Sequence, residues 1–126
     1  MADAAIPEDV QKFIVNCVDS IAYIEALMLL SRDFKVSWNS AVLTARLYIS
    51  VEEAKRVLDL MCSHGLVVEN NGFYRYECAS DDLRTVVGRL ARIYATHLIP
   101  VTHLIHSKTS SRVQQFADAF RLRKDK

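Results

Sequence analysis

The strongest constraint on the fold of this 126-residue chain is a capped helix that leads directly into a hairpin. Ser50 and Glu53 have the spacing of a capping box, in which Ser50 accepts a hydrogen bond from the Glu53 amide and Glu53 reaches back to the Ser50 amide. The predicted helix ends at Gly65, because glycine readily adopts the left-handed conformation that closes a helix. Its apolar residues recur at helical spacing and define one buried face: Ala54, Val57, Leu58 and Met61.

Two short strand-like segments follow this helix at once. Residues 66–69 and 73–77 are rich in β-branched and aromatic side chains, and Asn70-Asn71-Gly72 joins them. An Asn-Gly pair between such segments is the strongest short-range signal for a β-hairpin. The sequence therefore predicts a two-stranded ribbon directly after the capped helix.

Apolar spacing predicts two helices near the start of the chain. The first begins at Pro7 and lasts about three turns. The second is capped by Asp19 or Ser20 and ends near Arg32. The two segments can also form one helix with a bend.

A short helix is predicted between the second helix and the capped one. Asn39 or Ser40 is placed to cap it, and Leu43 and Leu47 lie four apart on its inner face. It lasts two turns at most.

A long last helix is predicted after the hairpin. Ser80 caps it, and Asp81 and Asp82 complement the helix dipole in its first turn. Pro100 lies inside the apolar pattern and should kink the helix or divide it in two. The regular apolar stripe is longer than a small domain needs, so we expect it to form the interface of a homodimer. Its members are Leu83, Val87, Leu90, Tyr94, His97, Val101 and Leu104.

The order of these elements from residue 20 to residue 77 resembles the winged helix-turn-helix superfamily. The long flanking helices make the arrangement most similar to the MarR-type branch, which is usually bacterial. The resemblance implies a mainly α fold with a small β-hairpin wing and long flanking helices. Residues 1–106 are then the winged-helix domain with its N-terminal and C-terminal dimerisation helices, and residues 107–126 form a basic amphipathic tail.

The resemblance also implies a transcription-regulatory protein that binds duplex DNA as a dimer. Ser50, Lys55 and Arg56 in the recognition helix would contact DNA, together with Asn71 and Arg75 in the hairpin. Lys55, Arg56 and Arg75 are the expected phosphate contacts.

The charge balance of this region opposes strong DNA binding. Residues 37–78 hold four basic and five acidic side chains, a net charge of −1. Neutralising phosphates supplies much of the affinity for DNA, so we expect weak binding. The alternative is a protein-interaction module that keeps the winged-helix fold and binds partners through its recognition face and its tail.

The tail differs sharply in charge from the rest of the chain. Residues 1–106 hold 10 Lys and Arg against 13 Asp and Glu, or −3, whereas residues 107–126 hold six against two, or +4. Phe116 and Phe120 lie four apart in the tail, next to Arg121 and Arg123. Two aromatic anchors on a short helix are typical of a segment that docks on its own domain, a dimer mate or another partner. The alternative is that the tail contacts nucleic acid or anionic lipid through its basic side chains.

No motif of an enzyme, cofactor site or metal site is present. The chain lacks a glycine-rich phosphate loop, a nucleophile elbow and an HExxH pattern. His103 and His106 share a helix face, but no Cys or carboxylate accompanies them at ligand spacing. We therefore expect a non-enzymatic protein without cofactor or metal.

The remaining sequence features are typical of a cytoplasmic protein. No apolar run reaches the roughly 20 residues that a bilayer span needs. The three cysteines, Cys17, Cys62 and Cys78, lie in apolar surroundings and are expected to be reduced thiols. A cluster of aromatic residues is expected to pack in the core and wing, or else to line a pocket for an aromatic effector. These residues are Trp38, Tyr48, Tyr74 and Tyr76.

Overall fold

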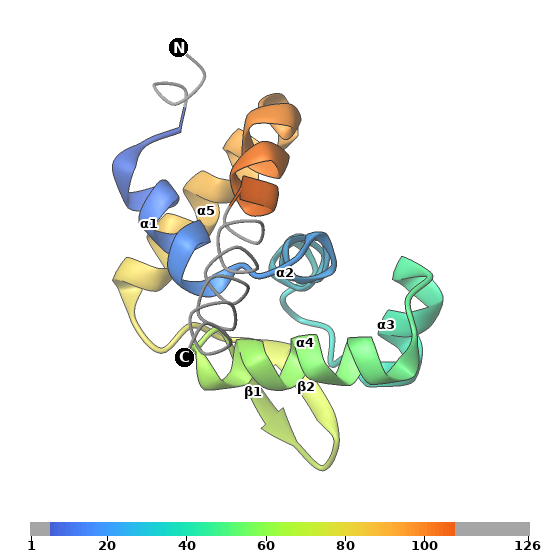
Figure 1. Cartoon of the computed structure of the whole chain (residues 1–126). Coiled ribbons are helices and arrows are strands. Elements are labelled where there is room, and N and C mark those ends of the chain that lie inside the picture. Colours follow the sequence, from blue (N-terminus) through green and yellow to red (C-terminus); the bar gives the residue numbers. More distant parts are fainter. Residues whose placement is uncertain (1–5, 108–126) are drawn as a thin grey trace, which may run out of the picture.

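The computed structural model describes residues 6–107, and the fold is mainly α with a small two-stranded wing (Figure 1). The element order agrees with the sequence prediction. The elements are α1 (Glu8–Cys17), α2 (Ile21–Arg32), α3 (Ser40–Leu47), α4 (Val51–Ser63), β1 (Val67–Asn70), β2 (Phe73–Tyr76), α5 (Asp81–Thr96) and a further helix over residues 98–107.

Side-chain caps fix the starts of four helices. Ser20 accepts from the Tyr23 amide at 3.1 Å, and Asn39 accepts from the Val42 amide at 2.8 Å. Ser20 and Asn39, rather than their neighbours, are therefore the caps of α2 and α3. Ser80 caps α5 in the same way. Each cap satisfies an amide that the helix itself leaves without a partner.

The capping box at α4 is only half formed. Ser50 Oγ accepts from the Glu53 amide at 3.0 Å, as predicted. The return bond to the Ser50 amide is not found among the described residues, because both Glu53 carboxylate oxygens accept from Arg56. At the other end of α4, Gly65 takes the predicted left-handed conformation, with a φ of 77°.

The first two helices are separate. The two helices meet at an angle of 116° with a break between them, so the alternative prediction of one helix with a bend is wrong. Within residues 6–107, no single helix is long and apolar enough to span a membrane.

The hairpin turns through two residues with left-handed backbones. Asn71 has a φ of 55° and Gly72 a φ of 83°, as a tight type I′ turn requires. The turn pairs Asn70 with Phe73, so Asn70 belongs to β1 and not to the loop.

A third stretch of chain joins this ribbon, which the sequence did not indicate. The Trp38 amide donates to the Tyr74 carbonyl at 2.7 Å, and the Tyr74 amide donates to the Trp38 carbonyl at 2.6 Å. This single bridge on the outer side of β2 ties the segment before α3 to the wing.

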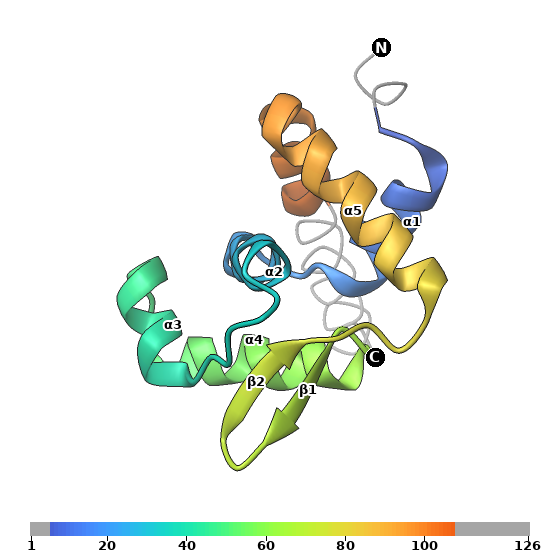
Figure 2. The same ribbon diagram turned by 180° about the vertical axis from the view of Figure 1, so that it is seen from behind.

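The core is organised around α2, which lies between the pair α1 and α5 on one side and α3 and α4 on the other (Figures 1 and 2). Tyr23, Ile24, Leu27 and Leu30 of α2 are completely buried. They meet buried side chains from both sides, and the same core therefore holds the flanking helices and the helix-turn-helix together.

The long last helix is divided, as Pro100 predicted. The break falls at His97, where φ is −130° and ψ is 50° and α5 ends. Pro100 then lies in the first turn of the helix over residues 98–107, where a missing amide costs no helical hydrogen bond. Val101 and Ile105 of this second helix are buried, so the division folds the chain back onto the core.

Candidate interaction surface of the helix-turn-helix and wing

The hairpin extends beside α4 (Figure 1), and both elements carry exposed side chains. We call the exposed part of α4, the α3–α4 turn and the hairpin the recognition surface. All five residues predicted to contact DNA are exposed on it: Ser50, Lys55, Arg56, Asn71 and Arg75.

Arg56 is held on two sides by carboxylates. Its guanidinium donates to Asp19 at 2.6 Å and to the two oxygens of Glu53 at 2.9 and 2.8 Å. A weaker contact at 3.4 Å reaches Ser20, the cap of α2. Hydrogen bonds from Arg56 lower the pKa of Glu53, so this carboxylate is ionised at neutral pH. Arg56 therefore acts as a clamp between the starts of α2 and α4.

Lys55 is linked to the wing through one acidic side chain. Lys55 Nζ lies 3.7 Å from the Asp59 carboxylate. The Tyr74 hydroxyl of β2 donates to the same carboxylate at 2.5 Å. This hydrogen bond, together with burial, raises the pKa of Tyr74 to about 12. Asp59 thus fixes the hairpin against α4 and neutralises Lys55.

The wing cation is also paired. The Arg75 guanidinium donates to the carboxylate of Glu77, two residues further along the chain, at 2.7 Å. Each expected phosphate contact therefore has a carboxylate of this chain within ion-pair distance. A phosphate would have to displace these carboxylates and then remain close to them, which removes much of the electrostatic gain.

Apolar side chains are exposed on the same surface. Tyr48 is 93% exposed and Val51 53% exposed, and they lie three residues apart at the α3–α4 turn. Tyr48 also takes a left-handed backbone with a φ of 58°, which turns the chain sharply from α3 into α4. On the outer face of the wing, Val68 and Phe73 border a shallow hollow of about 560 Å³.

Sequence reasoning missed this apolar character. The two strands were expected, but a ribbon has two faces, and the local sequence did not show which face the core covers. Tyr74 is buried and adjacent strand residues alternate between the faces, so Phe73 points to the other side. The four aromatic residues considered as one pocket are therefore not gathered together, since Tyr48 lies in solvent.

The predicted dimer stripe is largely covered by the chain itself. Val87, Leu90 and Val101 are buried in the monomer core. The other predicted stripe residues are half-buried: Leu83, Tyr94, His97 and Leu104. The argument for a dimer from an exposed stripe therefore does not apply to the three buried residues. Dimerisation stays a prediction, and the strongly exposed apolar side chains of this region are instead Leu98 and Ile99.

The remaining predicted sites add no further group to this surface. Phe116, Phe120, Arg121 and Arg123 lie outside the described residues. His103 and His106 are exposed, and residues 6–107 contain no group of three or more His, Cys, Asp or Glu side chains placed to hold a metal.

Comparison of the sequence with protein-family models gives no match, and comparisons with curated proteins and with solved structures give none either. The function proposed below rests on the geometry of the chain alone.

Proposed function

We propose that this chain is a winged-helix protein-interaction module, whose recognition surface binds a protein in preference to duplex DNA. One observation carries the proposal: Lys55, Arg56 and Arg75 are each paired with a carboxylate of the same chain. A phosphate-binding surface presents unpaired cations, whereas these three cations are each paired with a carboxylate.

The exposed apolar residues of the recognition surface support a protein partner. Protein interfaces are characterised by aromatic residues at a desolvated centre and polar pairs at the rim. Tyr48, Val51 and Phe73 supply the first kind of contact, and the paired charges around them supply the second. In the proposed interaction, the basic tail with Phe116 and Phe120 provides a second contact to the same partner.

Site-specific photocrosslinking tests the proposal directly. A benzophenone side chain is placed at Val51 or at Phe73 of the full chain, and at the exposed Lys12 of α1 as a control. After irradiation in the cells of origin, we expect larger crosslinked species from the first two positions and none from Lys12. Protease should destroy these species and nuclease should leave them unchanged. Crosslinks that nuclease removes would contradict the proposal.

A second candidate is a MarR-type regulator that binds duplex DNA. The flanking helices favour it, since α1 and α5 lie side by side away from the hairpin and are joined by an ion pair of 2.9 Å between Arg89 and Asp9 (Figure 2). Ser50 and Asn71 are also exposed at the start of α4 and at the wing tip. DNA binding of this kind would depend on Lys55 and Arg75 and weaken steeply with salt.

A further inference from the structure

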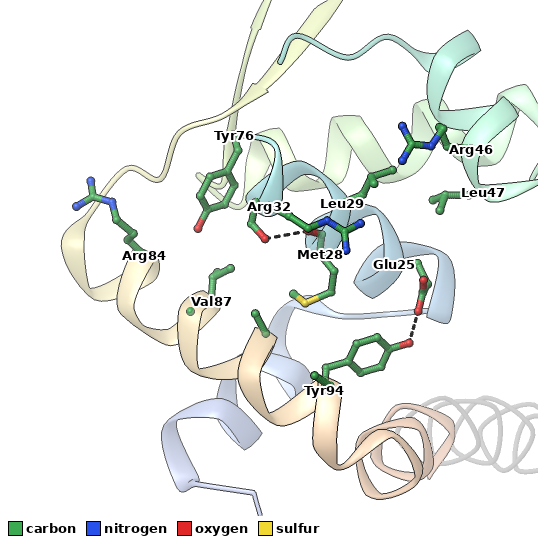
Figure 3. A pocket seen from close by; sticks show the side chains of 14 residues that line it. Glu25, Met28, Leu29, Arg32, Arg46, Leu47, Tyr76, Arg84, Val87 and Tyr94 are labelled. Carbon is green, nitrogen blue, oxygen red and sulfur yellow. Dashed lines mark hydrogen bonds between the residues drawn. The ribbon is translucent and has the colours of Figure 1, made fainter. Parts of the chain in front are cut away.

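A groove distinct from the recognition surface lies between α2 and α5. It has a volume of about 720 Å³, and α3 and β2 complete its border (Figure 3). Arg84 and Tyr76 lie toward one end. At the other end, the Tyr94 hydroxyl donates a hydrogen bond to the Glu25 carboxylate, which joins α5 to α2. Burial and this hydrogen bond raise the pKa of Tyr94, so the joint persists at neutral pH.

The α5 wall of the groove includes a row of small residues beside Arg84, Val87 and Tyr94. Gly88, Ala91 and Ala95 follow one another at helical spacing and all line the groove. A Cβ atom at Gly88 would meet nothing within 4 Å, so this chain's own packing does not require glycine there. Glycine inside a helix is destabilising relative to alanine, and its benefit here is a wall that another backbone can approach closely. At about 1.5 Å per residue, the wall is about 10 Å long, which matches two turns of a helix.

The rim of the groove is cationic, although the body of the chain is acidic. Three arginines and one glutamate line it, a balance of +2. Arg32 has no hydrogen-bond or ion-pair partner among residues 6–107. Arg46 packs over the Trp38 ring, 5.5 Å from its centroid, and likewise has no carboxylate partner in the described part of the chain. Arg84 pairs with Asp81. The groove therefore differs from the recognition surface, where each expected phosphate contact is paired.

From this combination we infer that the groove binds an acidic amphipathic helix of a partner protein. Its small or apolar residues would pack on Gly88 and Ala91, and its carboxylates would reach Arg32 and Arg46. An elongated wall of small residues favours a helix over a compact ligand, and the charge favours an acidic one. The chain's own tail does not fit, because residues 107–126 carry a net charge of +4. This inference is independent of what the recognition surface binds.

NMR titration of the full chain tests the inference. The probe is an alanine-rich helical peptide with leucine along one stripe and glutamate along the next, and the control peptide has every glutamate replaced by glutamine. We expect the glutamate peptide to shift the amides of Gly88 and Ala91 and the side-chain NεH signals of Arg32 and Arg46. The control peptide should bind at least about tenfold more weakly, because it lacks the charge-assisted hydrogen bonds.

Two variants separate occupation of the groove from general effects. Gly88→Leu fills the open wall while raising helix propensity, so it should fold and lose peptide binding. Arg32→Gln should weaken binding about tenfold, and the change Lys12→Gln, at an exposed cation of α1 that does not line the groove, should leave it unchanged. Circular dichroism confirms that each variant is folded.

Four results of the peptide titrations would overturn the inference, and a fifth would come from the chain alone. The first four are equal binding of the two peptides, shifts confined to the recognition surface, unchanged binding by Gly88→Leu, and tighter binding of 2-naphthoate, a small aromatic carboxylate, than of the peptide. Concentration-dependent shifts at Gly88 without peptide would assign the groove to a second copy of this chain and would overturn it as well.

Discussion

Replacing Arg56 by methionine removes the cation that joins the starts of α2 and α4 while keeping the aliphatic stem. The change leaves Asp19 and Glu53 close together without the guanidinium that bonds both at 2.6 to 2.9 Å. The Arg56 side chain is 42% exposed and that of Asp19 27%, so water screens the pairs considerably. Exposed ion pairs contribute about 0.2–1 kcal/mol each, and two pairs on one guanidinium therefore stabilise the fold by roughly 0.5–2 kcal/mol.

This loss should appear as a melting temperature lowered by about 3–10 °C at pH 7. The effect should also depend on pH. Because Arg56 lowers the pKa of Glu53, the stabilisation is fully present above the ordinary glutamate pKa of about 4.3 and is lost as the pH falls through the lower folded value. The difference between the wild type and Arg56→Met should therefore shrink below about pH 4.

Thermal denaturation followed by circular dichroism from pH 3 to pH 7 measures this prediction, with Arg92→Met as the control for an exposed arginine without a carboxylate partner in the described region. Duplex binding by Arg56→Met should equal that of the wild type. An unchanged melting temperature together with a clear loss of duplex binding would show that Arg56 serves a ligand and not the fold.

Three further predictions concern single positions. Gly72→Ala should destabilise the fold by about 1–2 kcal/mol because Gly72 has a φ of 83°. Gly88→Ala should stabilise it by up to about 1 kcal/mol, because a Cβ atom there meets nothing within 4 Å and alanine favours a helix. Urea denaturation of both variants measures the two effects. Leu90→Ala should lower the free energy of unfolding by about 2–5 kcal/mol at every protein concentration, since Leu90 is fully buried in the monomer. A destabilisation that disappears at higher protein concentration would instead show that Leu90 lies in a dimer interface. Tyr74 should titrate near pH 12 when followed by ultraviolet absorbance. Its contribution to stability is therefore complete below about pH 10 and is lost as the pH rises to about 12. Titration near pH 10 would show that the hydrogen bond from Tyr74 to Asp59 is absent.

Local signals predicted most of the fold. Ser20, Ser50 and Ser80 cap helices because a short side-chain oxygen satisfies an amide three residues ahead, and this depends only on the adjacent sequence. The Asn71-Gly72 turn is equally local, since both residues tolerate a positive φ.

The features that the sequence did not predict depend on contacts between residues far apart along the chain. The Trp38 bridge to Tyr74 spans 36 positions and adds a third stretch of chain to the edge of the wing. Arg56 was expected to be available to phosphate, but its partner Asp19 lies 37 positions earlier and comes near only when α2 packs against α4. Spacing along the chain carries no information on such a contact. The groove likewise depends on the separation of α2 and α5, which their individual patterns do not set.

In the proposed function, Lys55 and Arg75 are committed to Asp59 and Glu77 and do not bind phosphate. Fluorescence anisotropy of a labelled random duplex at low salt measures this, using the full chain and its Lys55→Gln, Arg75→Gln double variant, which removes both cations without adding negative side chains. Any duplex binding should then come from the basic tail, so the two proteins should have the same affinity and the same salt dependence. A loss of tenfold or more in the variant, with a shallower salt slope, would show that the wing and α4 bind DNA and would contradict the account.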